Sequence, residues 1–170
     1  MKTDFLEKLK SFDIPTCLRV CAGTDGSVTF LLEIMTRHEV SVVTEDQHIV
    51  KADEQIASLL NIDVGDEVNC RTVTLVADGI PYVYARSMSP IGRMPEAVRL
   101  DMMRADIPIG KILRDHGIET RRDFDKIGIV NCEGLFGCSA VLSRSYNIIH
   151  KSTVLMRINE QFPVDSRWNL

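Results

Sequence analysis

The stretch EVNCRTVTLVADGIPYVYARSMS, residues 67–89, contains the clearest structural signal in the sequence. Two runs rich in Val, Thr and Tyr, residues 67–77 and 80–89, flank the dipeptide Asp78-Gly79. Asp-Gly is favoured in two-residue β-turns because both turn residues need a positive φ angle. The segment therefore predicts two antiparallel strands joined by a tight turn.

A second hairpin is predicted near the C-terminus, where residues 140–149 and 152–162 flank His150-Lys151. Two further strands are expected at residues 38–50 and 119–130. Helices are expected in five segments: residues 3–11, 28–35, 52–62, 95–103 and 107–117. Strands joined by hairpins, with the helices in a few separate segments, predict an α+β fold built on an antiparallel sheet. The length of 170 residues suits a single domain, residues 1–170.

The composition is that of an ordinary soluble globular protein, with 45% hydrophobic and 26% charged residues. No apolar run approaches the eighteen or so residues of a membrane span. The N-terminus lacks the apolar core of a signal peptide, so we expect a cytoplasmic protein without membrane contact. The net charge of −4 argues against a nucleic-acid partner. Five cysteines without a CxxC pair and four scattered histidines argue against a zinc site and favour free thiols.

Four charged residues share the apolar face of a predicted strand. Glu160 alternates with Ile158 and Phe162, although an unpaired buried charge is costly. By the same alternation three arginines point toward apolar faces: Arg71, Arg86 and Arg144. Buried ion pairs, or arginine stems that reach solvent at the sheet edge, would explain each one singly. As a set they favour a pocket for an organic anion, because a guanidinium can bind a carboxylate through two hydrogen bonds.

Several short segments, taken in their order and spacing, resemble the chorismate pyruvate-lyase family, in particular its archaeal-type branch. The effector-binding domains of GntR-type transcription repressors share the fold of that family. The resemblance runs from about Ser27 to Pro163. The matching segments are SVTFLLE, CRTVTLVADGIPYVYARSMSP, IPIGKIL, TRRDF and MRINEQFP.

The resemblance implies an activity and two catalytic residues. Members of the family convert chorismate to 4-hydroxybenzoate and pyruvate by an elimination that makes the ring aromatic. The family's substrate-fixing arginine matches Arg71, and its essential glutamate matches Glu160. Arg71 would anchor a carboxylate, whereas Glu160 would contact the C4 hydroxyl and act as an acid or a base. No metal and no organic cofactor is implied.

The same match implies further substrate-binding residues. The backbone amides of Val28 and Ile109 would hold the bound acid, with Gly110 beside Ile109 at a helix start, where free N–H groups favour anions. Two arginines match other positions of the family's pocket region, Arg86 and Arg122. TRRDF contains a second arginine, Arg121, which stays open as the alternative to Arg122.

Two other functions stay open beside the lyase. A sensor domain of the repressor type would bind a small acid without transforming it. Such repressors carry a winged-helix domain before the sensor, and only 26 residues precede Ser27, so the lyase is the preferred prediction. An interaction protein would explain the arginines and the glutamate as plain ion pairs. For the lyase and the sensor alike, the expected partner is a small aromatic or cyclohexadienyl carboxylate, and a homodimer is left open.

Overall fold

A computed structural model describes residues 3–104, 107–131 and 135–170. Over these residues the chain forms a six-stranded sheet in the order β1-β2-β3-β6-β5-β4, in which every neighbouring pair is antiparallel. The strands are β1 Val40–Lys51, β2 Glu67–Ala77, β3 Ile80–Pro90, β4 Arg121–Asn131, β5 Ala140–His150 and β6 Thr153–Pro163. The α-helices are α1 Thr3–Ser11, α2 Thr16–Gly23, α3 Val28–Thr36, α4 Glu54–Leu60, α5 Glu96–Met103 and α6 Ile109–Asp115. The predicted α+β fold with an antiparallel sheet is confirmed.

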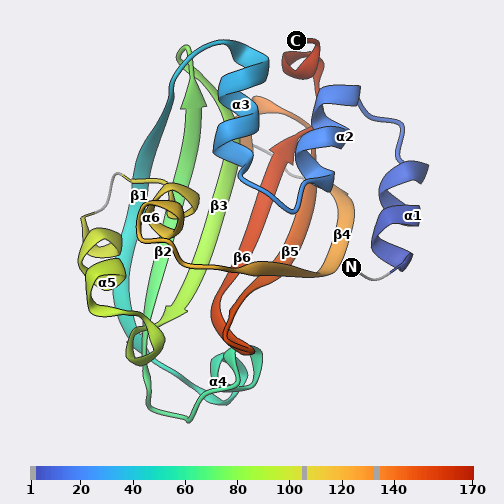
Figure 1. Cartoon of the computed structure of the whole chain (residues 1–170). Coiled ribbons are helices and arrows are strands. Elements are labelled where there is room, and N and C mark those ends of the chain that lie inside the picture. Colours follow the sequence, from blue (N-terminus) through green and yellow to red (C-terminus); the bar gives the residue numbers. More distant parts are fainter. Residues whose placement is uncertain (1–2, 105–106, 132–134) are drawn as a thin grey trace.

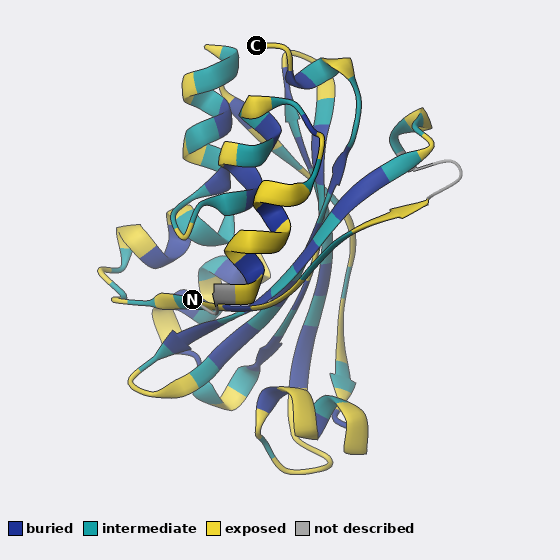
Figure 2. Cartoon of the chain, turned by 90° about the vertical axis from the view of Figure 1, so that its right-hand side faces the viewer, coloured by how far each residue is buried: buried dark blue, intermediate teal, exposed yellow. Residues whose placement is uncertain are grey.

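Most of the helices gather on one face of the sheet (Figures 1 and 2). Helices α2, α3, α5 and α6 lie in front of the strands in Figure 1, and α1 lies beside β4. Helix α4 closes one end of the sheet, where Leu60 packs with Val68 and Val154. The opposite face of β5 and β6 is polar, since the Asn159 side chain donates to the hydroxyls of Ser143 and Ser145, at 3.0 Å each. The sheet therefore has one face for the main core.

Both hairpins turn through two residues with positive φ. In the first, φ is 49° at Asp78 and 73° at Gly79, the conformation that the dipeptide predicts. In the second the turn residues are Lys151 and Ser152, with φ of 46° and 65°, one position later than predicted. Lys151 and Ser152 adopt this conformation without a glycine, which is why the sequence marks the turn less sharply.

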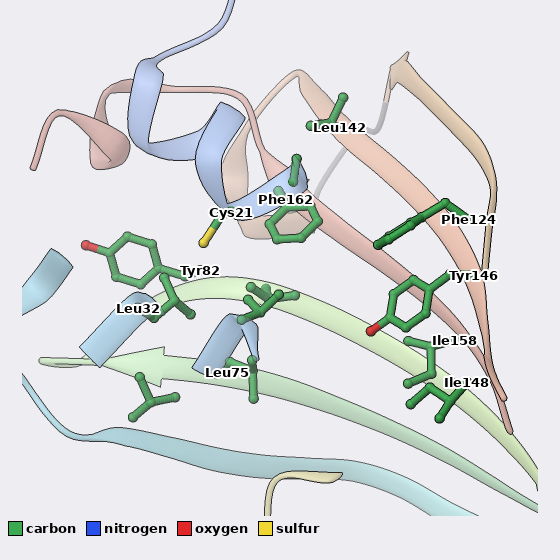
Figure 3. Packing of buried hydrophobic residues seen from close by; sticks show 14 of the residues in the cluster. Cys21, Leu32, Leu75, Tyr82, Phe124, Leu142, Tyr146, Ile148, Ile158 and Phe162 are labelled. Atoms are coloured by element: carbon green, nitrogen blue, oxygen red, sulfur yellow. The ribbon is translucent and has the colours of Figure 1, made fainter. Parts of the chain in front are cut away.

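The core fills the space between the sheet and the helices. Leu32 of α3, Leu142 of β5 and Phe162 of β6 are fully buried there (Figure 3). Helix α2 contributes Leu18 and Cys21, although residues 16–23 have no counterpart among the predicted helices. Their spacing of three residues is the helical signal in this segment, and burial raises the pKa of the Cys21 thiol to about 12. Cys21 is therefore an inert core residue.

Four charged residues were predicted to lie on the apolar faces of their strands. The prediction is confirmed for three of them and wrong for the fourth. Arg71, Arg144 and Glu160 are buried, with 3%, 0% and 6% of their surfaces exposed. Arg86 is exposed, and its guanidinium lies over the ring of Tyr84, 5.3 Å from the ring centre. The reason is a β-bulge in β3. Val76 of β2 pairs with Pro81 and the neighbouring Leu75 pairs with Val83, which leaves Tyr82 as an extra residue. A bulge moves every later side chain to the other face, so Arg86 points away from the core.

Other sequence predictions bear on membranes and metals. Within the described ranges, no helix has the length and apolar character that spanning a membrane requires. Cys17, Cys21 and Cys70 are free thiols, the Cys138 thiol donates to the Ala140 carbonyl at 3.2 Å, and Cys132 lies outside the described residues. The part of the chain that the structure describes contains no group of three or more His, Cys, Asp or Glu side chains placed to hold a metal ion.

We expect Trp168→Ala to destabilise the fold by about 3–5 kcal/mol, the usual cost of removing a buried tryptophan. Trp168 is 1% exposed, its ring meets Tyr82 edge-on at 5.1 Å, and its Nε1 donates to the Pro163 carbonyl at 2.7 Å. Urea unfolding would measure the change, with Val64→Ala, at a position 65% exposed, as the control. Equal stability of the two variants would contradict the packing of the C-terminal segment.

Candidate functional site

A cavity of about 70 Å³ lies between the sheet and the starts of α3 and α6. All six strands contribute to its floor, through Val42, Arg71, Val73, Leu75, Ala85, Ser87, Arg122, Tyr146, Ile148, Ile158 and Glu160. The two helix starts form its roof, through Ser27, Val28, Thr29, Pro108, Ile109 and Gly110. The volume has room for several water molecules, and the lining is mostly apolar with a few polar groups, as in small-molecule sites.

Glu160 is held by a buried ion pair. Its Oε2 accepts a hydrogen bond of 2.7 Å from Nε of Arg144, on the neighbouring strand. The side chains of Arg144 and Glu160 are 0% and 8% exposed. A guanidinium stays protonated in proteins, so its buried positive charge requires a negative partner close by. Glu160 supplies that charge as a carboxylate.

Arg144 is itself fixed from several sides. Its Nη1 donates to the carbonyl oxygens of Ala22 and Thr24, at 2.7 and 3.0 Å, at the end of α2. Its guanidinium carbon lies 5.1–5.4 Å from the ring centres of Phe124, Tyr146 and Phe162. Aromatic faces attract a guanidinium. Arg144 thus ties α2 to the sheet and sets the position of the Glu160 carboxylate.

The second carboxylate oxygen of Glu160 is hydrogen-bonded to Tyr146. The Tyr146 hydroxyl donates to Glu160 Oε1 at 3.1 Å, and the residue is 3% exposed. Burial raises the pKa of Tyr146 far above its ordinary value, and the nearby charge of Glu160 raises it further. The phenol therefore stays protonated at neutral pH. Figure 3 shows Tyr146 beside Ile148 and Ile158, two other residues of the cavity floor.

Arg71 lines the same cavity from β2, two strands away from Glu160 on β6 in the order of the sheet. It pairs with Ser87 on β3, which pairs with Ile158 on β6, two residues from Glu160. Two strand spacings and a two-residue offset separate the backbones of Arg71 and Glu160 by about 12 Å. Nη1 of Arg71 donates to the Ile107 carbonyl at 3.1 Å, just before α6. The cavity lies between a guanidinium on one side and a carboxylate on the other.

The two helix starts meet above this space. Ser27 caps α3 by accepting a hydrogen bond of 3.3 Å from the Phe30 amide. Gly110 on α6 comes so close to Ser27 that a side-chain carbon at position 110 would lie 3.3 Å from the serine Oγ. The first N–H groups of a helix have no acceptor within the helix. The predicted residues Val28, Ile109 and Gly110 all line the cavity.

The arginine that TRRDF contributes to the cavity is Arg122. Its Nη1 donates to the Asp25 carbonyl at 2.7 Å, and its guanidinium carbon lies 5.8 Å from the centre of the Tyr146 ring. Arg121 is exposed and pairs with Asp123 at 3.0 Å. Arg86 does not line the cavity, because the bulge in β3 turns it away. The structure thus brings together all the predicted site residues except Arg86.

Two contributors to the site match no residue that the family resemblance assigns to it: Arg144, predicted only as one of the charged residues on apolar faces, and Tyr146. The sequence shows which face of β5 they lie on, because Leu142, Arg144, Tyr146 and Ile148 occupy every second position. What the sequence does not display is their register against Glu160. An extra residue in β6 at Leu155, between the pairs Ile148–Met156 and Ile149–Val154, shifts the strand by one position and places Arg144 opposite Glu160.

Known proteins are similar to this chain in sequence and in fold. A model of the family described as “Chorismate pyruvate-lyase Rv2949c-like” matches residues 23–170. The “Putative lyase MJ0807” of Methanocaldococcus jannaschii is 37% identical over 166 residues, which cover 91% of this chain and 82% of that protein. The chorismate pyruvate-lyase of Mycobacterium leprae is 27% identical over 114 residues, 66% of this chain and 54% of that protein.

The similar solved structures include regulators. PhnF from Mycobacterium smegmatis superposes with a TM-score of 0.66 at 18% identity, covering 83% of this chain and 65% of PhnF. A GntR-family transcriptional regulator from Bacillus cereus gives a TM-score of 0.57 at 16% identity, covering 73% of this chain and 91% of that structure. At such identities the likeness concerns the fold alone. The family, in contrast, follows from the sequence match over residues 23–170: the chain belongs to the Rv2949c-like chorismate pyruvate-lyase family.

Proposed function

We propose that the protein is a chorismate lyase, which converts chorismate to 4-hydroxybenzoate and pyruvate. The observation that carries the proposal is the buried Glu160 carboxylate, fixed by Arg144 and Tyr146, which lines a cavity with Arg71 on its far side. Membership of the family and the name of the Mycobacterium leprae relative support the same reaction.

The reaction needs orientation, charge neutralisation and the movement of one proton. The C4 proton leaves, the C3–O bond breaks, and the departing enolpyruvate takes up a proton at its methylene carbon to become pyruvate. No electron is gained or lost overall, so the balance requires no redox partner. The ring becomes aromatic, which supplies much of the driving force.

The roles of the residues follow from their places around the cavity. Arg71 anchors the ring carboxylate through its guanidinium fork. Glu160, held as a carboxylate by Arg144, acts as the base toward the C4 proton and contacts the C4 hydroxyl. Arg122 lies on the Tyr146 side of the floor and faces the second carboxylate, that of the enolpyruvyl group. The amides of Val28 and Ile109 add donors from the roof.

A sensor that binds a small acid without transforming it is the second candidate. The fold likeness to PhnF and to the Bacillus cereus regulator favours it. Both candidates use the same cavity and differ only in whether chorismate is consumed. We retain as predictions a cytoplasmic location and a small carboxylate as the partner, and a homodimer is one arrangement open to test.

The direct experiment is to incubate the purified protein with chorismate and follow pyruvate and 4-hydroxybenzoate together. We expect the two products in equal amounts, in the presence of a chelator as well as without it. Binding of 4-hydroxybenzoate, seen as a raised melting temperature, without any pyruvate would favour the sensor.

Arg71→Ala should weaken the binding of 4-hydroxybenzoate by roughly 1.5 to 3.5 orders of magnitude. The change removes the charged partner of a desolvated carboxylate, a loss of about 2–5 kcal/mol. Arg86→Ala is the matched control, because Arg86 is an exposed arginine on the adjacent strand that points away from the cavity. Calorimetric titration of both variants with 4-hydroxybenzoate measures the effect. Similar affinities of the two variants would show that Arg71 does not bind the ligand.

Glu160→Gln should lower chorismate turnover by about 10²–10⁴-fold, because the amide cannot accept the C4 proton. The variant also leaves the buried Arg144 charge without a carboxylate, which we expect to lower stability. Turnover is therefore compared at a temperature where circular dichroism shows the variant folded. Glu67→Gln, at an exposed surface pair with Lys51, serves as the control. Normal turnover by the folded Glu160→Gln variant would refute the proposed base.

A further inference from the structure

A groove on the surface of the molecule adjoins the cavity of the candidate site. It has a volume of about 510 Å³ and lies between α3, the start of β1 and the segment that leads into α6. Helices α3 and α6, which supply the roof of the cavity, both lie in front of the β1–β3 side of the sheet (Figure 1). Thr29, Val42 and Pro108 line the groove and the cavity alike, so the two spaces meet at these residues.

The two walls of the groove carry opposite charges. Lys111 and Arg114 lie on the α6 wall, and Glu33 and Glu39 lie on the wall that α3 and the start of β1 form. Both cations are exposed, and their spacing of three residues places them on one face of the helix. Among the described residues neither cation pairs with a carboxylate, and the guanidinium carbon of Arg114 lies 6.0 Å from the centre of the Phe30 ring. Two positive charges are therefore available to a ligand on the α6 wall.

The positive wall continues inward to the cavity. Ile107 and Pro108 line the groove just before α6, and the Ile107 carbonyl accepts a hydrogen bond of 3.1 Å from Nη1 of Arg71. Arg71 lies in the floor of the cavity. A carboxylate that follows this wall therefore meets Lys111 and Arg114 at the surface and Arg71 inside.

An anion needs such local charges because the chain as a whole repels it. The formal net charge is −4, so the long-range field of the protein does not draw a carboxylate toward the cavity. Cations at the mouth of a cleft raise the local concentration of an anion and its association rate constant. The carboxylates of Glu33 and Glu39 repel the anion from the opposite wall, which directs it to the α6 side.

We propose that the groove is the entrance to the cavity, and that Lys111 and Arg114 form an outer cation pair that captures the carboxylate of an incoming ligand before Arg71 binds it. The outer cation pair sets how fast the ligand arrives and takes no part in the chemistry. This inference rests on the proposed function in one respect, that the cavity binds a small carboxylate. It is independent of whether that carboxylate is transformed.

The first test measures binding kinetics in the double variant Lys111→Ala/Arg114→Ala. Stopped-flow mixing with 4-hydroxybenzoate should give an association rate constant about 10-fold lower than that of the unmodified protein at low salt. The dissociation rate constant should change little, because charges at the rim of a site act mainly on association. At about 1 M salt, where the Debye length is about 3 Å, the two association rate constants should converge.

The matched control is Lys126→Ala/Lys151→Ala, which removes the same net charge from two exposed positions away from the groove. Lys126 pairs with Ser145, on the polar face of the sheet, and Lys151 lies in the turn between β5 and β6. We expect this control to retain the association rate constant of the unmodified protein. Equal rate constants in the two double variants at low salt would overturn the proposal. A deficit of Lys111→Ala/Arg114→Ala that persists at 1 M salt would do the same, because it would be structural rather than electrostatic.

The second test uses the opposite wall, where the effect should have the opposite sign. Glu39→Gln removes an exposed negative charge from the groove and should raise the association rate constant for 4-hydroxybenzoate at low salt. Glu54→Gln, at an exposed position on α4, is the control and should leave the rate constant unchanged. A rate constant that is unchanged or lowered in Glu39→Gln would show that the ligand does not pass between these walls.

Chorismate turnover separates this inference from the proposed function. If no pyruvate forms but the association of 4-hydroxybenzoate depends on the outer cation pair, the lyase is wrong and the entrance stands. If pyruvate forms and association is insensitive to Lys111→Ala/Arg114→Ala, the lyase stands and the entrance is wrong. A protein that neither binds 4-hydroxybenzoate nor consumes chorismate would overturn both.

Discussion

The ion pair between Arg144 and Glu160 is the interaction on which the candidate site depends. It joins neighbouring strands, and through the carbonyls of Ala22 and Thr24 it also holds the end of α2 against the sheet. Burying two charges is expensive, and well-packed apolar residues in their place are often at least as stabilising. Stability alone therefore gives no reason for the pair. Its carboxylate lines the cavity, and the orientation of that carboxylate gives the reason.

The cavity combines this fixed acceptor with donors that come from distant parts of the chain. Arg71 on β2 approaches from one side, and Arg122 on β4 lies over the ring of Tyr146 on the other. The starts of α3 and α6 meet above them, where Gly110 allows a close approach to Ser27. The antiparallel sheet sets these groups at fixed spacings, so little reorganisation is needed when a ligand binds, and such preorganisation is a main source of catalytic power. The likeness to PhnF from Mycobacterium smegmatis is one of fold alone.

Much of this could be predicted from the sequence because strong local signals agree with the fold. The Asp78-Gly79 turn and the alternation of side chains around Glu160 are such signals, and the structure has both. Bulges have no comparable signal. The extra residue at Tyr82 sends Arg86 to the wrong face for a site residue, and the extra residue at Leu155 brings Arg144 opposite Glu160. The position of each bulge depends on how the whole strand packs. The alternation of apolar and polar residues does not contain that information.

A crystal structure of the protein with 4-hydroxybenzoate would show whether the cavity binds the proposed product in the proposed orientation. We predict the ring within the cavity between the sheet and the starts of α3 and α6, with the carboxylate on the guanidinium of Arg71. The hydroxyl should point to Glu160, and the Arg144–Glu160 pair should keep its 2.7 Å hydrogen bond. A ligand bound outside this cavity, or one bound with its carboxylate toward Glu160, would contradict the account.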